Sequence, residues 1–183
     1  MLTLFLLVLL AVTSPSICKM KAMSYGDVFG QLTDTEFIST KSGKSLSDLK
    51  KLGADYIAIT VYAQQDGKNG QEIRTISDLD NIRYLVGHAQ VMGMKTFLKP
   101  IVEACCPRTW RGFIVPTKAW YDSYTRWIVD LAEFAEREEV DLFSVGSELV
   151  NADNNTATDW KRIVKQVRDV YNGKVCLVLL FES

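Results

Sequence analysis

The chain has 183 residues, of which 48% are hydrophobic and 23% are charged, and its formal net charge is -1. This length fits one ordinary globular domain of roughly 100–200 residues, and the apolar content argues against intrinsic disorder. Because there is no basic excess to neutralise phosphates, nucleic acid is not expected as a partner. The same balance gives no attraction to an anionic membrane surface.

Residues 1–18 have the pattern of a secretory signal peptide. Met1–Val12 is an apolar run, and Pro15 and several small residues follow it. A run of about 12 residues matches a signal-peptide core and falls short of the roughly 20 that a spanning helix needs. The alternative is a short buried strand or helix. We expect a signal peptide at 1–18, a domain over 19–183, and a secreted protein that leaves the membrane after cleavage; a sequon predicts glycosylation at Asn154.

Beyond the signal segment, the cysteines are Cys105, Cys106 and Cys176. An odd number in an oxidising compartment leaves one thiol over. Adjacent Cys105 and Cys106 could form a strained vicinal disulfide, whereas Cys176 is expected to be a small buried residue inside a strand. The spacing fits no zinc site, and His88 is the only histidine. We therefore expect no metal, and nothing in the sequence indicates a cofactor.

The rest of the chain alternates strand-like and helix-like segments. Apolar runs predict strands that begin near Met20, Tyr56, Lys95, Asp141 and Val175. Several runs are almost continuously apolar, as in parallel strands covered on both faces. Capping signals and a 3.6-residue apolar period predict helices at about 45–53, 77–93, 117–139 and from Trp160 to just before Gly173. Three of these helices stop at a glycine before a strand, which is typical of βαβ units.

Two α/β architectures fit this alternation, an open doubly wound sheet and a (β/α)8 barrel. The open sheet would accommodate five strands directly. However, no glycine-rich phosphate loop follows the first strand, so nucleotide binding has little support. In both architectures the active site lies at the carboxyl ends of the strands.

Several polar side chains stand at those strand ends. The most informative is Glu148, which follows an apolar strand beside small residues that leave room for a ligand. Trp110 and Arg111 lie in the long loop after the third strand, where a tryptophan face can stack on a sugar and an arginine can hold an oxygen. The alternative for Glu148 is an exposed loop carboxylate, or a carboxylate paired with Lys99 or Arg111. The alternative for Trp110 and Arg111 is a loop anchor without a role in binding. The remaining strand-end groups are Tyr25, Tyr62, Asp66, Lys99, Glu103 and Glu182.

Other conspicuous residues have a simpler interpretation. His88 lies within a predicted helix, so no Ser/His/Asp or Cys/His set can be assembled around it. The aromatic stripe of Trp120, Tyr124 and Trp127 recurs at helical spacing and is expected to be core.

A series of short motifs carries a resemblance to a known family. They are, in order, Lys21–Tyr25, Ser45–Lys50, Leu52–Ala54, Phe97–Pro100, Trp110–Gly112, Val145–Leu149, Trp160–Ile163 and Val167–Arg168. Each is weak alone, but their order and spacing together resemble glycoside hydrolase family 113, a group of β-mannanase-like (β/α)8 enzymes. The resemblance covers roughly residues 19–178.

The resemblance implies a retaining glycosidase that cleaves β-1,4-mannosidic bonds of a mannan-like polysaccharide or oligosaccharide. The glutamate that ends the fourth strand is the general acid/base of such enzymes, which assigns that role to Glu148. Lys99, Trp110 and Arg111 would line the sugar site, with Tyr25 at its floor. The chain departs from the family at Ala22, where glycine is usual, and at Ile101, where histidine is frequent.

The resemblance also predicts an incomplete barrel. The family's nucleophile is a glutamate on the seventh strand, whereas this sequence stops after a predicted fifth strand. Residues 19–183 are too few to close a barrel, which takes about 200 residues or more. We therefore expect the N-terminal part of a (β/α)8 TIM-like barrel with about five strands and four helices. A mannanase-type hydrolase, if the barrel is complete, and an inactive secreted carbohydrate-binding protein that lacks the nucleophile are the two expected functions.

Overall fold

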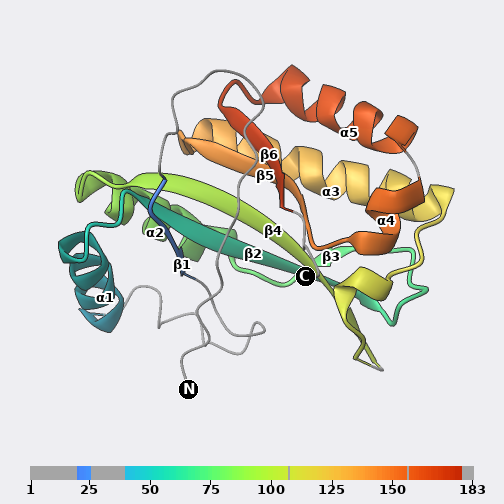
Figure 1. Ribbon diagram of the computed structural model, residues 1–183, viewed down its shortest axis with the longest axis horizontal. Helices are drawn as coiled ribbons and strands as arrows, with labels where there is room; N and C mark the ends of the chain where they lie inside the picture. The colour runs from blue at the N-terminus through green and yellow to red at the C-terminus, as the bar shows by residue number, and fades with distance from the viewer. Residues whose placement is uncertain (1–19, 26–39, 107, 156, 179–183) are drawn as a thin grey trace.

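The computed structural model describes residues 20–25, 40–106, 108–155 and 157–178 (Figure 1). The elements alternate as expected, and their bounds are β1 (Ala22–Tyr25), α1 (Thr40–Lys51), β2 (Tyr56–Asp66), β3 (Arg74–Thr75), α2 (Leu79–Val91), β4 (Lys95–Cys105), the 3-10 turn η1 (Arg111–Phe113), α3 (Lys118–Arg137), β5 (Leu142–Ser147), α4 (Val150–Asn155), α5 (Ala157–Val170) and β6 (Lys174–Val178). Every predicted strand and helix is present among these elements. Short β3, α4 and η1 were not predicted.

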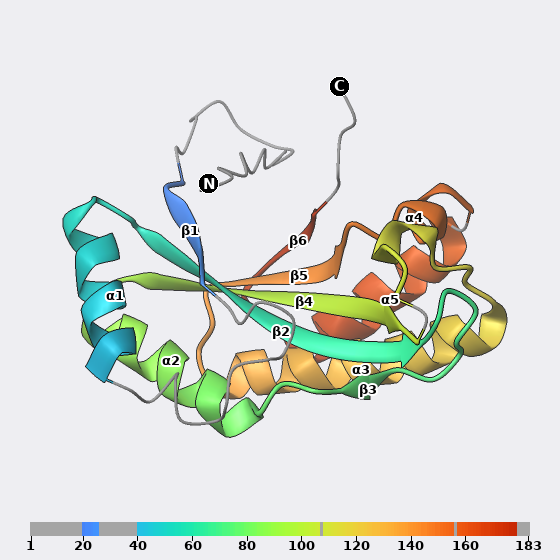
Figure 2. The same ribbon diagram turned by 90° about the horizontal axis from the view of Figure 1, so that it is seen from below.

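The sheet has the order β1-β2-β4-β5-β6, and all of these neighbours pair in parallel. The two-residue strand β3 adds an antiparallel pair to β2. Figure 2 shows a curved sheet with α1, α2, α3 and α5 all on its convex side. A doubly wound sheet would carry helices on both faces, so the arrangement is that of a partial (β/α) barrel.

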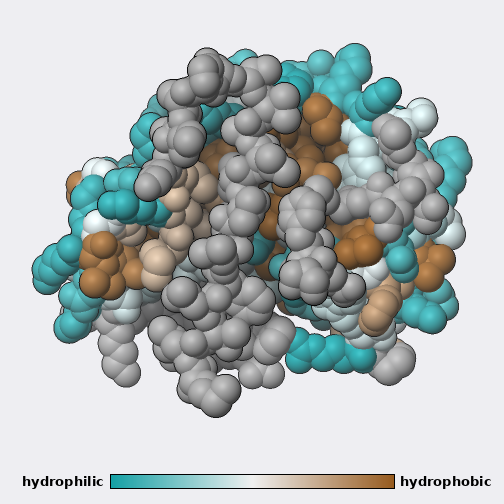
Figure 3. All heavy atoms as spheres, viewed as in Figure 1, coloured by the Kyte–Doolittle hydropathy of each residue, from teal (hydrophilic) through white to brown (hydrophobic). Residues whose placement is uncertain are grey.

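Alternation along the strands separates two apolar clusters. The larger one lies between the sheet and the helices and includes Ile57, Ile59, Leu98 and Phe143. The smaller one lies on the opposite face and consists of Ala58, Phe97, Leu142 and Val178. Figure 3 views this second face, where apolar surface is visible at the middle and hydrophilic residues surround it. The strands are apolar on both sides, as interior barrel strands must be.

The helix ends follow the predicted turn chemistry. The Asp78 side chain accepts a hydrogen bond from the backbone N–H of Asp80 and caps α2. Gly53 and Gly93, which follow α1 and α2, have φ values of 83° and 68°, a left-handed conformation that glycine adopts without steric cost. After α3 the same conformation falls on Glu139, with a φ of 54°, which is why no glycine marks that helix end in the sequence.

The aromatic stripe of α3 is core, as predicted. Trp120 stacks on Tyr124 with ring centroids 4.8 Å apart. The indole N–H of Trp120 donates to Gln65 at 2.7 Å, and the hydroxyl of Tyr124 donates to the backbone oxygen of Val145 at 2.8 Å. These bonds satisfy the polar atoms of large buried rings and fix α3 against the strands. His88 lies in α2 and packs edge-on to Tyr84.

Some sequence predictions lie outside the described residues. These are the signal peptide over 1–18, the strand-end Glu182, and the side chain of Asn154, whose backbone belongs to α4. In the part of the chain that is described, no helix combines the length and apolar character needed to span a bilayer.

Candidate active site at the carboxyl ends of the strands

Beyond its first residue, strand β4 carries two charged residues on the face opposite the helices. Lys99 and Glu103 are four residues apart and therefore project from the same side of the strand. Lys99 is 9% exposed and lies across from Thr60 of β2. Burial, which disfavours the ammonium form, lowers the pKa of Lys99, and the charge of nearby Arg111 adds to this; the carboxylate of Glu148 acts in the opposite direction.

The chain after β4 turns back toward this strand. The backbone N–H of Thr109 donates to the backbone oxygen of Ala104 at 2.9 Å, which closes a tight reversal. Cys106, within the reversal, has a left-handed φ of 57°. As a result, Arg111 at the start of η1 returns to the end of β4 and reaches Glu103.

Glu148 follows the last residue of β5 and has a φ of 58°. Its backbone N–H donates to Val178 of β6 at 3.0 Å, which holds this strained conformation in place. The last pair between β4 and β5 is Leu98 with Phe143. Glu103 and Glu148 each lie five residues beyond that pair, so they end neighbouring strands at the same level.

The guanidinium of Arg111 joins these two strand ends. Its Nη1 donates to Oε2 of Glu148 at 2.7 Å, and its Nη2 donates to Oε1 of Glu103. The side chains of Arg111, Glu103 and Glu148 are 14%, 15% and 20% exposed. A planar guanidinium that binds one carboxylate through each terminal nitrogen has a defined orientation. From the sequence, an ion pair with Arg111 is one alternative to a catalytic role for Glu148, and the structure contains this ion pair.

Some polar atoms of these strands lack a partner. In the described part of the chain, Nε of Arg111 and the hydroxyls of Thr60, Thr96 and Ser147 are buried without a hydrogen-bond partner. Thr60 lies across from Lys99 and Ser147 precedes Glu148, whereas Thr96 is at the other end of β4. Such groups carry a desolvation cost that a ligand hydroxyl or a water could relieve. The cluster therefore combines a carboxyl group able to transfer a proton with donors and acceptors suited to a polyhydroxylated ligand.

The structure brings three of the predicted sugar-site residues together and leaves one elsewhere. Glu148, Arg111 and Lys99 belong to one cluster. Trp110 adjoins it, but its ring lies directly over Gly112 and meets Phe113 edge-on at 5.2 Å between centroids. A Cβ on residue 112 would clash with that ring, so the glycine permits this packing.

The placement of Tyr25 at the floor of the sugar site is not what the structure shows. Tyr25 packs against the helix-side core, and its hydroxyl donates to Ser42 of α1 at 2.8 Å. Its neighbour in β2 is Ile59, and β2 continues for seven more residues before its carboxyl end. The short strand β1 thus turns this side chain away from Glu148.

Glu103 is the site residue that the sequence interpretation did not select. It was one of several strand-end polar residues, with no sign of its contact to Arg111. Its spacing of four residues from Lys99 is the signal that would have placed it on the same face. The contact itself depends on the chain reversal after β4, which that spacing does not encode.

The three cysteines of the domain are free thiols in the structure. Cys176 lies in β6, and burial raises the pKa of its thiol to about 11. Cys105 and Cys106 lie at the end of β4, where the structure has no vicinal disulfide. Across residues 20–25, 40–106, 108–155 and 157–178, no group of three or more His, Cys, Asp or Glu side chains is arranged to hold a metal ion.

Known proteins share both the sequence pattern and the fold. The family model for Glycoside Hydrolase Family 113 matches residues 23–179. Two solved β-1,4-mannanases of that family have TM-scores of 0.76 and 0.73, identities of 24% and 26%, and overlaps of 85% of this chain with 54% of theirs. The family's β-mannanase from Alicyclobacillus acidocaldarius, solved in complex with ManMIm, has a TM-score of 0.76 at 23% identity, over 85% of this chain and 53% of that one. No curated protein matches the chain.

The chain thus spans about half the length of the solved structures that it matches. The overlap supports the partial barrel described above, since the shared part is a parallel sheet with helices on its outer side.

Proposed function

We propose that this chain, which belongs to glycoside hydrolase family 113, provides the acid/base half of a retaining β-1,4-mannanase active site, with Glu148 as the acid/base. The observation that carries the proposal is the position of Glu148. It stands at the carboxyl end of β5, largely buried, and is oriented by an arginine shared with Glu103. Two of the solved structures that this chain resembles are a β-1,4-mannanase and a β-mannanase of the family, which supports mannanase-like glycoside hydrolysis.

In the proposed reaction, Glu148 acts twice. Its protonated carboxyl first gives a proton to the glycosidic oxygen as the leaving sugar departs. Its carboxylate then takes a proton from the water that releases the glycosyl group from the nucleophile. Oε2 of Glu148 is engaged by Arg111, so Oε1 is the oxygen that would face the substrate.

Lys99, Trp110 and Arg111 would bind the sugar around this carboxyl group. The ammonium of Lys99 would donate hydrogen bonds to sugar hydroxyls. Trp110 would contribute an aromatic surface at the rim. The family match and the solved mannanases support a mannan-like polysaccharide or oligosaccharide as the proposed substrate.

A retaining mechanism also requires a nucleophilic carboxylate about 5–5.5 Å from the acid/base. The resemblance implies a glutamate on a seventh strand for this role, and the described residues form five parallel strands. Glu103 is held by Arg111 and is not assigned that role. The second candidate function is a secreted carbohydrate-binding protein that binds the same class of sugar at this site without turnover.

Hydrolysis of mannan and manno-oligosaccharides, measured as released reducing ends, tests the proposal. We expect turnover that falls about 10²–10⁴-fold in Glu148→Gln, with Asp122→Asn on the outer helices as the matched control. Turnover that survives Glu148→Gln would reject the acid/base assignment. Binding of manno-oligosaccharides without turnover by the unmodified chain would instead support the carbohydrate-binding function.

Secretion and glycosylation are further parts of the proposal. The apolar run before Pro15 supports a signal peptide at 1–18, and the sequon supports a glycan at Asn154. The intact mass of the protein from its native source, before and after glycan removal, tests both. A first residue near position 19 and a mass decrease on deglycosylation are the expected results, whereas an intact Met1 would exclude cleavage.

A further inference from the structure

We propose that Glu103 is a positioning residue for the acid/base: it holds Arg111 so that this arginine fixes the carboxyl group of Glu148. The inference rests on the proposed function, in which Glu148 transfers the proton. It extends that function to a residue on a different strand that does not touch the reacting atoms.

The geometry of the arginine carries the argument. A guanidinium bound through one nitrogen can rotate about that contact, whereas a guanidinium bound through both terminal nitrogens keeps its plane. Nη1 of Arg111 binds Glu148, Nη2 binds Glu103, and Nε has no partner in the described part of the chain. Glu103 therefore provides the second of the two hydrogen bonds that define the plane of Arg111.

The path of the chain makes this second contact necessary. Arg111 lies in η1, beyond a reversal that is closed by one backbone bond between Thr109 and Ala104. Strands β4 and β5 show no pairing beyond Leu98 and Phe143. Arg111 links the ends of these two strands through side chains alone, and Glu103 supplies the link on the β4 side.

Fixing Arg111 also decides which oxygen of Glu148 can carry the proton. Oε2 accepts the Arg111 hydrogen bond, which leaves Oε1 for the leaving oxygen. If Arg111 turns away, the carboxyl group of Glu148 can rotate, and its proton is no longer directed at the glycosidic oxygen. A misplacement of about 1 Å can reduce a rate by about 10²-fold, so losing Glu103 should impair proton transfer more than substrate binding.

Two substitutions separate positioning from a general structural role. Glu103→Met keeps the length of the side chain but removes the acceptor, whereas Glu103→Gln keeps an acceptor oxygen. We expect Glu103→Met to lower kcat on manno-oligosaccharides about 10–100-fold with little change in KM. Glu103→Gln should restore most of that loss. Asp159→Leu, which removes one of two carboxylates bound by Arg162 on the outer helices, is the matched control and should leave kcat unchanged.

The leaving group gives a readout that a merely structural defect would not move. An aryl mannoside with an acidic phenol needs little protonation, so Glu103→Met should slow its hydrolysis much less than that of manno-oligosaccharides. Equal losses on both substrates would overturn the proposal.

A crystal structure of Glu103→Met tests the same inference without turnover. We expect the 2.7 Å contact between Arg111 and Glu148 to be lost, and to be retained in Glu103→Gln; an unchanged contact in Glu103→Met would overturn the proposal. If Glu103→Met does not fold, Glu103→Ala replaces it. If the unmodified chain hydrolysed neither substrate, that result would reject the proposed function. The crystal structures would still decide the role of Glu103.

Discussion

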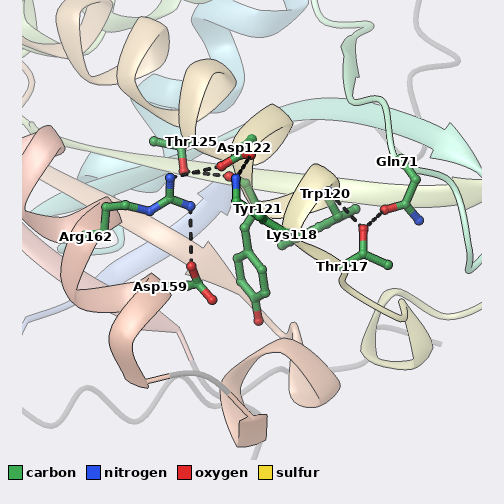
Figure 4. A network of polar contacts seen from close by, with 9 residues as sticks. All are labelled: Gln71, Thr117, Lys118, Trp120, Tyr121, Asp122, Thr125, Asp159 and Arg162. Carbon is green, nitrogen blue, oxygen red and sulfur yellow. Dashed lines mark hydrogen bonds and ion pairs between the residues drawn. The ribbon is translucent and has the colours of Figure 1, made fainter.

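Two arginines in this molecule make the same pair of contacts in very different surroundings. Arg111 binds Glu148 through Nη1 and Glu103 through Nη2 at the strand ends. Arg162 of α5 binds Asp122 through Nη1 and Asp159 through Nη2 on the outer helices (Figure 4). The side chains around Arg111 are 14–20% exposed, whereas those around Arg162 are 29–39% exposed.

The difference lies in what the ion pairs cost. Exposed charges keep most of their hydration, so the Arg162 network adds little to stability and joins α3 to α5. Buried charges lose that hydration, and their mutual attraction only partly offsets the loss. A shielded cluster with unsatisfied polar atoms is therefore poor as a stabilising device, and it is better explained as a site arranged for a ligand. Removing charges from each region tests this contrast.

Substitution of the two arginines should give the largest difference. Arg111→Met leaves Glu103 and Glu148 side by side without their shared cation, and we expect a loss of about 2–3 kcal/mol in the free energy of unfolding, below the full cost of a completely buried pair. Arg162→Met should cost distinctly less because water screens the remaining aspartates. Urea denaturation of both variants measures the two losses. Equal losses would mean that the strand-end cluster is no more desolvated than the helix surface.

The lysines of the two regions should differ in a pH-dependent way. Burial lowers the pKa of Lys99 from its ordinary value of 10.5, so the native state is penalised for keeping the ammonium charged. This penalty is complete at a pH below the pKa of Lys99 in the native state. It disappears as the pH rises from that pKa to the pKa of Lys99 in the unfolded chain. At neutral pH, Lys99→Met should therefore have a larger free energy of unfolding than the unmodified chain. This gain should be smaller than the loss expected for Arg111→Met. It should also lack the rise in stability toward pH 10.5.

Lys118 provides the control for this comparison. Its side chain is 86% exposed and binds Asp122 at 2.6 Å on the surface of α3. Lys118→Met should leave the alkaline rise of stability intact, as measured by thermal unfolding between pH 7 and pH 10. A rise that persists in Lys99→Met would show that another group is responsible for it.

The same contrast explains what the sequence could and could not reveal. Apolar runs and capping signals identified every long strand and helix because those patterns are local. Glu148 was identifiable because it ends a strongly apolar strand. Tyr25 was placed wrongly because a four-residue strand does not show which of its alternating faces meets the helices. The contact between Arg111 and Glu103 depends on a chain reversal that is stabilised by one backbone hydrogen bond. No local sequence pattern predicts that reversal.

The acid side of the stability profile should give the smallest effect. Hydrogen bonds from Lys118 and Arg162 hold the pKa of Asp122 below its ordinary value of 3.8. A carboxyl group with a lowered native pKa stabilises the fold above the unfolded value, and this contribution is lost as the pH falls through the native pKa. Asp122→Asn should therefore lower the stability slightly at neutral pH, and this difference should disappear as the pH falls below about pH 4, which gives the variant a shallower acid slope.

Asp130, another exposed aspartate of α3, is the matched position for this measurement, since no ion pair of the described residues involves it. Thermal unfolding from pH 2.5 to pH 6 should show the shallower acid slope in Asp122→Asn and the original slope in Asp130→Asn. Salt should narrow the difference, because exposed pairs are screened within a Debye length of about 8–10 Å. If 0.5 M salt left the difference unchanged, the Arg162 network would be shielded from solvent much as the Arg111 cluster is, and the contrast between the two regions would fail.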